Sequence, residues 1–238
     1  MSKLIDDRKN RVAAVLPILK RTYPSAKCSL DYKNPLELLV ATILSAQCTD
    51  VRVNIVAPAL FKKYRTAKDY ANAAQEELEK AIQSTGFYRN KAKSIRAMAA
   101  DLVEKYGGKV PRTMEELTDL AGVGRKTANV VLGNAYGINI GITVDTHVSR
   151  VSHRLGLTTH TDAVKIEKDL MPLVPQEDWA LWSHLLIAHG RAICVARNPK
   201  CRECPLLSYC PAGQKLVAAT EKIAPKRQDA KSAKKEKA

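Results

Sequence analysis

Leu117–Leu132, the most informative stretch of the chain, reads Leu-Thr-Asp-Leu-Ala-Gly-Val-Gly-Arg-Lys-Thr-Ala-Asn-Val-Val-Leu. A short helix is predicted to begin just before it, because Thr113 and Glu116 have the spacing of a capping box. That helix breaks at the Gly-Val-Gly sequence of residues 122–124. Apolar residues then resume at the spacing of a second helix, with Ala128, Val131 and Leu132.

The Gly-Val-Gly turn is a candidate binding site for an anion. Two glycines around one apolar residue allow a tight turn that leaves backbone N–H groups facing outward. The helix that follows begins with free N–H groups and the positive end of its dipole, which favour an anion such as a DNA phosphate. A bare Gly-x-Gly would indicate only a turn between helices. Combined with Leu117, Leu120 and the sequence Lys126-Thr127-Ala128, it predicts a helix-hairpin-helix DNA-binding unit over about residues 113–134, whose candidate DNA-binding residues are Gly122, Val123, Gly124 and Arg125.

The charge of the chain favours a polyanionic partner. The 238 residues include 39 Lys and Arg against 24 Asp and Glu, a formal net charge of +15. Residues 215–238 carry eight basic and three acidic side chains, so most of the excess charge lies outside this tail. The tail has few large apolar residues and is predicted to be disordered, where it would raise nonspecific affinity for DNA through counterion release.

The sequence predicts a cytoplasmic, nucleoid-associated monomer without a membrane partner. No run of residues is long and apolar enough to span a bilayer, and the first residues lack the apolar core of a signal peptide. Length alone allows one or two domains with a sizeable core. In a reducing compartment the six cysteines favour a metal site over a disulfide framework.

The apolar residues recur with the period of an α-helix along nearly the whole chain. The sequence Asn-Pro-Leu-Glu of residues 34–37 is a typical helix start, with a cap, a first-turn proline and a glutamate at the third position. There is no strand alternation and no internal repeat, so an all-α fold is predicted. Further helices are expected over about 51–64, 74–84, 90–106, 145–155, 162–172 and 177–190.

Four cysteines close together near the end of the chain predict a metal centre. Their pattern is Cys194-x6-Cys201-x2-Cys204-x5-Cys210, compact enough to surround one group. Structural zinc and an iron–sulfur cluster both accept four thiolates, and the thiolate count alone does not choose between them. Ordinary structural roles are assigned to the two remaining cysteines and to the five histidines, none of which has paired metal-ligand spacing: Cys28, Cys48, His147, His153, His160, His184 and His189.

Three further positions have an unusual local sequence. An apolar helix runs into Gln47 and its polar neighbours without a glycine or proline stop, which is typical of a solvated connection. Phe87 follows a glycine in a turn with basic neighbours, and taken alone it is predicted to be a core residue. Asp145 fits a helix N-cap, and the same position suits an exposed carboxylate in a pocket because caps lie at helix mouths.

Taken together, these motifs resemble the endonuclease III family of the helix-hairpin-helix superfamily of DNA glycosylases. The resemblance covers roughly residues 10–212. It rests on Leu44-Ser45-Ala46-Gln47-x-Thr49-Asp50, Gly86-Phe87-Tyr88-x-x-Lys91-Ala92, Gly122–Ala128, Val144-Asp145-Thr146-His147, His189-Gly190-Arg191 and the cysteine spacing. One departure is Ala121, where the family usually has proline, and it is expected to leave the hairpin less rigid.

The resemblance implies two helical domains with the active site in the cleft between them. Residues 28–138 would form a six-helix barrel that contains the helix-hairpin-helix. Residues 1–27 and 139–214 would form a discontinuous iron–sulfur domain, followed by the tail of residues 215–238. The resemblance also implies that the four thiolates bind a [4Fe-4S] cluster rather than zinc, with a structural and DNA-positioning role.

The resemblance further implies an enzyme of base excision repair, a bifunctional DNA glycosylase and AP lyase. Its partner would be double-stranded DNA containing damaged bases, mainly oxidised pyrimidines, or abasic sites. By the same resemblance, the damaged nucleotide would be flipped out, Gln47 would fill the hole and Phe87 would wedge the opposite strand. Lys126 would attack the sugar C1′ and form a Schiff base while Asp145 stabilises positive charge on the sugar, and β-elimination would then cut the strand 3′ to the lesion.

Two alternatives stay open at this point. The first is an adenine or mismatch glycosylase without lyase activity. Related adenine glycosylases lack the lysine and use a glutamate on the helix near Gln47, whereas residues 42–47 contain no carboxylate here. The second is a non-catalytic, metal-stabilised DNA-binding module in which Lys126 only contacts phosphate.

Overall fold

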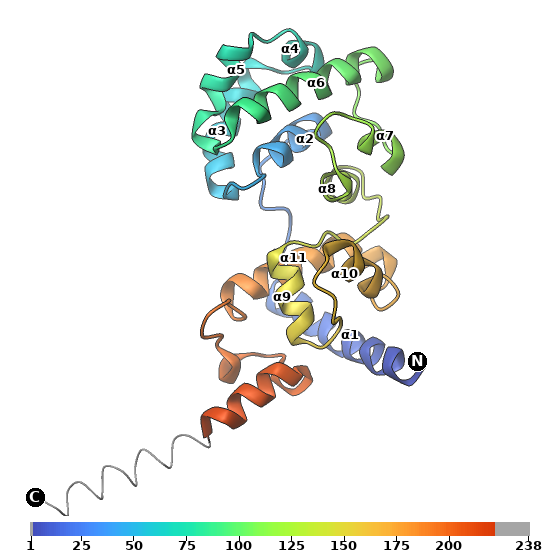
Figure 1. The fold of residues 1–238 in the computed structure, drawn as a ribbon. Helices are drawn as coiled ribbons and strands as arrows, with labels where there is room; N and C mark the ends of the chain where they lie inside the picture. The colour runs from blue at the N-terminus through green and yellow to red at the C-terminus, as the bar shows by residue number, and fades with distance from the viewer. Residues whose placement is uncertain (1, 222–238) are drawn as a thin grey trace, which may run out of the picture. The chain divides into compact units, whose positions relative to one another are not determined.

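The computed structural model describes residues 2–221, and the regular elements among them are all helices, which confirms the predicted all-α fold (Figure 1). The chain forms two compact units. Unit 1 comprises the described part of Met1–Ala26 and Val144–Ala238, and unit 2 comprises Lys27–Thr143. None of the described helices has the length and apolar character needed to cross a membrane.

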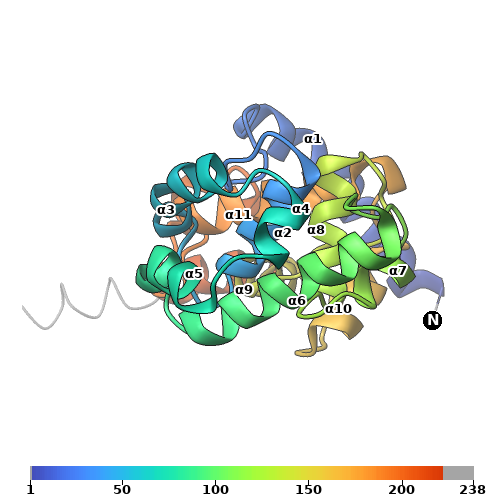
Figure 2. The same cartoon turned by 90° about the horizontal axis from the view of Figure 1, so that it is seen from above.

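Unit 2 contains seven α-helices and one 3-10 turn. They are α2 (Pro35–Leu44), α3 (Asp50–Lys63), α4 (Ala67–Ala71), α5 (Gln75–Ile82), η1 (Gln83–Thr85), α6 (Tyr88–Tyr106), α7 (Met114–Thr118) and α8 (Arg125–Ala135). The long helix α6 packs against α2, α4 and α5, and α8 packs against α2 and α7 (Figures 1 and 2). The core between them is made of fully buried aliphatic side chains, among them Leu39, Leu44, Ile95, Leu102, Leu117 and Leu132.

Helix α2 begins where the sequence predicts it. The Asn34 side chain accepts a hydrogen bond from the Glu37 N–H at 2.9 Å, and Pro35 occupies the first helical position. The Glu37 carboxylate in turn accepts from the Lys33 N–H at 2.6 Å. These contacts satisfy N–H groups that a helix start leaves without an internal partner, and they fix where the chain enters the core.

Helix α4 is missing from the sequence-based prediction. It has only five residues, so its apolar period is too short to be seen. A capping box holds its start: the Asp69 N–H donates to the Thr66 hydroxyl at 3.2 Å and the Thr66 N–H donates to the Asp69 carboxylate at 2.8 Å. Ala67 and Tyr70 are buried in the core beside α6, which supplies the packing that a single helical turn lacks on its own.

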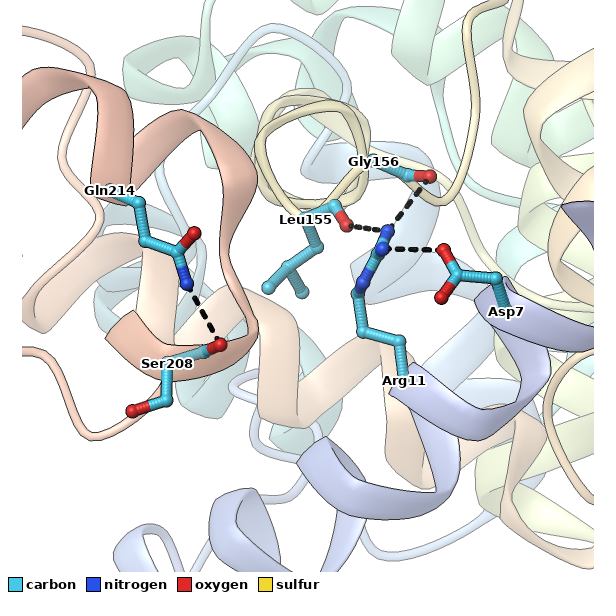
Figure 3. Close-up of polar contacts among 6 residues, drawn as sticks. All are labelled: Asp7, Arg11, Leu155, Gly156, Ser208 and Gln214. Carbon is cyan, nitrogen blue, oxygen red and sulfur yellow. Dashed lines mark hydrogen bonds and ion pairs between the residues drawn. The ribbon is translucent and has the colours of Figure 1, made fainter.

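Unit 1 joins the first helix of the chain to its last third. Its elements are α1 (Ser2–Thr22), α9 (Thr146–Arg154), α10 (Ala163–Leu170), η2 (Gln176–Asp178), α11 (Trp179–Ala192), η3 (Cys201–Glu203) and η4 (Leu207–Tyr209), and α1 and α9 both pack against α11. Arg11 of α1 donates to the carbonyl of Leu155 at 2.9 Å, which satisfies a carbonyl at the end of α9, and it pairs with Asp7 at 2.7 Å (Figure 3).

The first part of the predicted disordered tail is helical in the structure. Residues 211–221 are helical, so the prediction of disorder is wrong for residues 215–221, and residues 222–238 lie outside the described part of the chain. Leu216 lines the same cavity as the four cysteines. Arg202 pairs with the Glu221 carboxylate at 3.2 Å, so contacts with the folded unit hold a segment whose composition alone suggests disorder.

Candidate functional site

The predicted hairpin is formed by α7, a tight turn and α8. The Thr113 hydroxyl caps α7 by accepting the Glu116 N–H at 3.3 Å, and Leu117 is fully buried. Gly122 has φ = +74°, a conformation that L side chains rarely adopt. A Cβ at Gly122 would also lie 2.8 Å from the Ser94 Cβ of α6. Backbone conformation and packing therefore both require glycine at this position.

Gly124 differs from Gly122, because neither its φ angle nor its packing among the described residues requires glycine. It is the N-cap of α8 with φ = −94°, and a Cβ built there would meet no atom within 4 Å. Because glycine has no side chain, no N-cap side chain covers the first turn of α8. Arg125 and Lys126 of that turn are exposed. The start of α8 is thus an open backbone surface with two cationic residues beside it, as an anion site at a helix N-terminus needs.

Ala121 makes a contact that proline could not make. Its N–H donates to the Asp101 carboxylate of α6 at 3.3 Å, and Lys105 pairs with the same carboxylate at 3.4 Å. Proline has no N–H and would leave this hydrogen bond unmade. The expected loss of rigidity at Ala121 is therefore opposed by a direct link from the hairpin to α6.

The two predicted catalytic residues lie in different units. Lys126 is the second residue of α8 in unit 2, with an exposed side chain. Asp145 is the N-cap of α9 in unit 1, where its Oδ1 accepts the Val148 N–H at 2.7 Å and the side chain is half-buried. The cap uses Oδ1 of Asp145. The role of Asp145 as a helix N-cap is therefore compatible with its role as a carboxylate in a pocket.

Helix α9 is held closely against α11 just after Asp145. A Cβ at Gly190 of α11 would lie 2.9 Å from the His147 Nδ1, so only glycine allows this approach. Arg150 contacts the same nitrogen at 3.0 Å and donates to the Gly190 carbonyl at 3.0 Å. Burial lowers the pKa of His147, which favours the neutral ring beside this arginine. These contacts fix the helix start that carries Asp145.

Gln47 and Phe87 share an unusual backbone conformation in unit 2. Both are non-glycine residues in the left-handed region, with φ = +52° for Gln47 and φ = +48° for Phe87. Both side chains are exposed, Phe87 to 62%. The prediction of Phe87 as a core residue is therefore wrong, because a turn directs it away from the core. Left-handed non-glycine residues cost conformational free energy and cluster at functional sites.

All four predicted ligand cysteines of unit 1 line one cavity. The cavity measures about 270 Å³ and is otherwise lined mainly by apolar side chains, including Leu155, Ile193 and Leu206. Burial raises the pKa of Cys204 to about 11 and also raises the pKa of Cys201 and Cys210. Thiolates in such surroundings need cations or hydrogen-bond donors to be stable.

Several of those donors are present at the cavity wall. Arg154 approaches the Cys194 Sγ at 3.3 Å, and the Gly213 N–H donates to the Cys210 Sγ at 3.3 Å. His189 Nε2 lies 3.6 Å from the Cys204 Sγ, and its Nδ1 contacts the Tyr23 hydroxyl at 3.0 Å. The sequence alone predicts only a general structural role for His189. The motif His189-Gly190-Arg191 is recognisable in the sequence. The position of His189 beside the Cys204 thiol, however, depends on the turn that follows α11.

The arrangement of the thiols around the cavity suits a cluster. A single zinc ion needs its ligands about 2.3 Å from one point. Four thiols spread around an apolar cavity instead fit a group of several iron and sulfide atoms, stabilised by hydrogen bonds to sulfur.

Comparison with known proteins agrees with this geometry. The profile of the HhH-GPD superfamily of base excision DNA repair proteins matches residues 40–176, and the profile of the iron–sulfur binding domain of endonuclease III matches residues 194–210. Endonuclease III of Synechocystis is 57% identical over 207 residues, which cover 87% of this chain and 94% of the relative. The chain belongs to the endonuclease III family. These matches indicate a [4Fe-4S] cluster for this family member, and the matched residues 194–210 contain all four cysteines.

Two solved structures share the fold and carry DNA. One is titled as a non-covalent endonuclease III–DNA complex and the other as a trapped endonuclease III–DNA covalent intermediate. Each is 48% identical to this chain with a TM-score of 0.83, over 88% of this chain and 98% of the other. An endonuclease III fold is therefore established for this family member over most of its length.

The metal centre gives a direct prediction. Purified protein should be brown and contain about four irons per chain, as the stoichiometry of a [4Fe-4S] cluster requires. Cys204→Ser should lose most of the visible absorbance, whereas Cys48→Ser, a cysteine of unit 2, should retain it. Iron analysis and visible spectroscopy check both expectations. Colourless, folded protein with one zinc per chain would overturn the assignment.

Proposed function

We propose that this endonuclease III family member is a bifunctional DNA glycosylase and AP lyase of base excision repair. Its substrate is double-stranded DNA that contains oxidised pyrimidines or abasic sites. The observation that carries the proposal is the exposed lysine Lys126 in the first turn of α8, directly after the Gly-Val-Gly turn. We further propose that it acts as a monomer in the cytoplasm, at the nucleoid.

The chemistry needs a neutral amine and a stabilising carboxylate. The Lys126 Nζ attacks the sugar C1′, and the bond between C1′ and the damaged base breaks with the electron pair leaving on the base. The sugar ring opens to give a Schiff base between C1′ and Lys126. Loss of a C2′ proton then expels the 3′ phosphate by β-elimination, and water releases the lysine. Asp145 stabilises positive charge on the sugar in the first step.

DNA opening is assigned to unit 2. A base inside a duplex cannot be reached, so the damaged nucleotide must leave the stack. Gln47 fills the space that the nucleotide leaves, and Phe87 wedges into the opposite strand. The exposure of both side chains and their turn conformations support this proposal.

The four cysteines would hold the [4Fe-4S] cluster, whose role would be to stabilise its domain. Base release and elimination involve no electron transfer.

The hairpin binds the DNA backbone without reading its sequence. Gly122, Val123 and Gly124 present backbone N–H groups to phosphate and Arg125 adds a cationic side chain. Phosphate contacts position a protein on DNA but carry little sequence information. The hairpin therefore supplies affinity for damaged and undamaged DNA alike, and the damaged base is distinguished in a later step, when the nucleotide is flipped.

The two glycines of the hairpin should respond differently to alanine. Gly124→Ala should fold and should lower the melting temperature only slightly, by the modest N-cap preference of glycine over alanine, because its Cβ meets no described atom within 4 Å. It should bind damaged and undamaged DNA about tenfold more weakly, because the methyl group stands where the backbone approaches phosphate. Gly122→Ala should instead lower the melting temperature, since it combines φ = +74° with the contact to Ser94.

Melting curves and DNA titrations of both variants check this pair of expectations. Equal destabilisation by the two substitutions, or unchanged DNA affinity of Gly124→Ala, would contradict the assignment of the hairpin to phosphate binding.

A panel of duplexes tests the function itself. Each duplex carries one oxidised pyrimidine, one mismatched adenine or thymine, or one abasic site, and base release and strand cutting are scored separately. The proposal expects release of oxidised pyrimidines and cutting at abasic sites. Base release from mismatches without cutting would indicate a monofunctional glycosylase, and binding without either reaction would indicate a non-catalytic module.

A further inference from the structure

Lys91 is a lysine buried in unit 2 that the mechanism above does not use. It lies in the first turn of α6 and is only 5% exposed. Its Nζ donates to the carbonyl of Leu44 at 2.8 Å and to the carbonyl of Thr85 at 2.8 Å. A buried ammonium is costly unless hydrogen bonds compensate for lost water, and burial accordingly lowers the pKa of Lys91. A leucine at this core position would carry no desolvation cost of a buried charge, so the presence of an ammonium here needs an explanation.

The two carbonyls belong to the two loops that carry Gln47 and Phe87. Leu44 is the last residue of α2, so its carbonyl is one of those that a helix end leaves without an internal partner. Gln47 follows three residues later. Thr85 is the last residue of η1, and Phe87 follows two residues later. One ammonium thus joins the starting points of both loops.

The backbone of Lys91 strengthens the second link. Its N–H donates to the carbonyl of Phe87 at 3.1 Å, which is the first hydrogen bond of α6. Lys91 therefore contacts the Phe87 turn through its main chain and both turns through its side chain. Gln47 and Phe87 are left-handed residues on short exposed turns, and such conformations persist only where the surroundings hold them.

We propose that Lys91 is a positioning residue for duplex opening: its ammonium fixes the Gln47 and Phe87 turns relative to each other. The two side chains then enter the base stack as one preorganised pair. The inference rests on the insertion roles of Gln47 and Phe87 in the proposed function. Lys91 itself touches neither the DNA nor the reacting atoms in this account, and it acts through the geometry of the two turns.

The test compares two lysines of the same helix. Lys91→Met keeps the length and apolar stem of the side chain but removes the donors to both carbonyls. Lys93→Met is the matched control, since Lys93 is exposed on α6 and loses the same charge. Single-turnover base release is measured for an oxidised pyrimidine in a fully paired duplex and for the same lesion opposite an abasic-site analogue, where opening costs less.

The ratio between these two substrates is the decisive readout. Lys91→Met should release the base about tenfold more slowly than wild type from the paired duplex, which is the expected effect of losing buried hydrogen bonds. Opposite the abasic-site analogue, its rate of base release should be within about twofold of wild type. Fluorescence of 2-aminopurine beside the lesion should report slower opening. Lys93→Met should leave the substrate ratio unchanged. If folded Lys91→Met slows both substrates equally, so that its substrate ratio equals that of Lys93→Met, the proposal is overturned.

Two further variants separate this inference from the proposed function. Gln47→Ala and Phe87→Ala should each slow base release more in the paired duplex than in the duplex with the abasic-site analogue. If neither does, the insertion roles fail, and the inference fails with them. If both do and Lys91→Met does not, only the inference fails. Adding Gln47→Ala to Lys91→Met should cost less than the two single effects combined, because both act on one structure.

A folding failure of Lys91→Met does not end the test. Lys91→Arg then takes its place, because it keeps a charged donor but changes its distance from the two carbonyls. Circular dichroism and melting curves establish that the variant is folded. If the ratio of base-release rates between the paired duplex and the duplex with the abasic-site analogue changes, the proposal is supported, and an unchanged ratio overturns it.

Discussion

Lys126→Gln is expected to bind lesion-containing DNA and to leave it uncut. Glutamine keeps polarity and hydrogen bonding at the exposed start of α8 but has no amine to attack C1′. Base release and strand cutting should both fall by a factor on the order of 10³ or more, as for loss of a nucleophile in other enzymes. Single-turnover assays with separate scoring of the two products measure this effect.

Lys126→Arg is the control for a role in phosphate binding. Arginine keeps the positive charge but stays protonated, so it cannot act as a nucleophile. The account expects wild-type DNA affinity from this variant together with the full loss of chemistry. Activity retained in Lys126→Arg would show that Lys126 serves as a phosphate contact, which is the view of the chain as a non-catalytic module.

Asp145→Asn is expected to lose most turnover without losing stability. Asparagine is as good an N-cap as aspartate and can still accept the Val148 N–H, which Asp145 Oδ1 binds at 2.7 Å. The substitution removes only the negative charge. Loss of such electrostatic stabilisation is commonly worth on the order of 3 kcal/mol, or a hundredfold or more in rate. Single-turnover base release and melting curves measure the two properties.

Asp145→Ala completes the comparison, because it removes the cap as well as the charge. It should show the same loss of turnover as Asp145→Asn and in addition lose about 1 kcal/mol of folding free energy. If Asp145→Asn released the base at the wild-type rate, the carboxylate would be a helix cap only, and its charge would play no part in the chemistry.

Local sequence patterns were sufficient for much of the fold and the metal centre. The hairpin was predictable because its turn, its apolar positions and its caps all lie within residues 113–134. The start of α2 was predictable from Asn34 and Pro35, whose contacts are with near neighbours. The cysteine site was predictable because the four ligands lie within seventeen residues, although the choice of a cluster over zinc needed the family resemblance and the cavity geometry.

Features that depend on distant contacts were missed. The apolar ring of Phe87 suggests a core residue, but its exposure follows from the turn that precedes α6. Lys91 stands in a recognisable motif, yet its ammonium binds a carbonyl 47 positions earlier in the chain, which no local pattern reveals. Composition predicts disorder for the helical residues 215–221, because it does not show their contacts with Arg202 and with the cysteine cavity.

The most direct test of the central claim is to identify the residue that becomes attached to DNA. The protein is mixed with an abasic-site duplex and borohydride, which reduces a Schiff base to a stable amine, and the linked peptide is sequenced by mass spectrometry. The account predicts a single attachment at Lys126, with no trapped product from Lys126→Gln. Attachment at another amine, or undiminished trapping of Lys126→Gln, would contradict it.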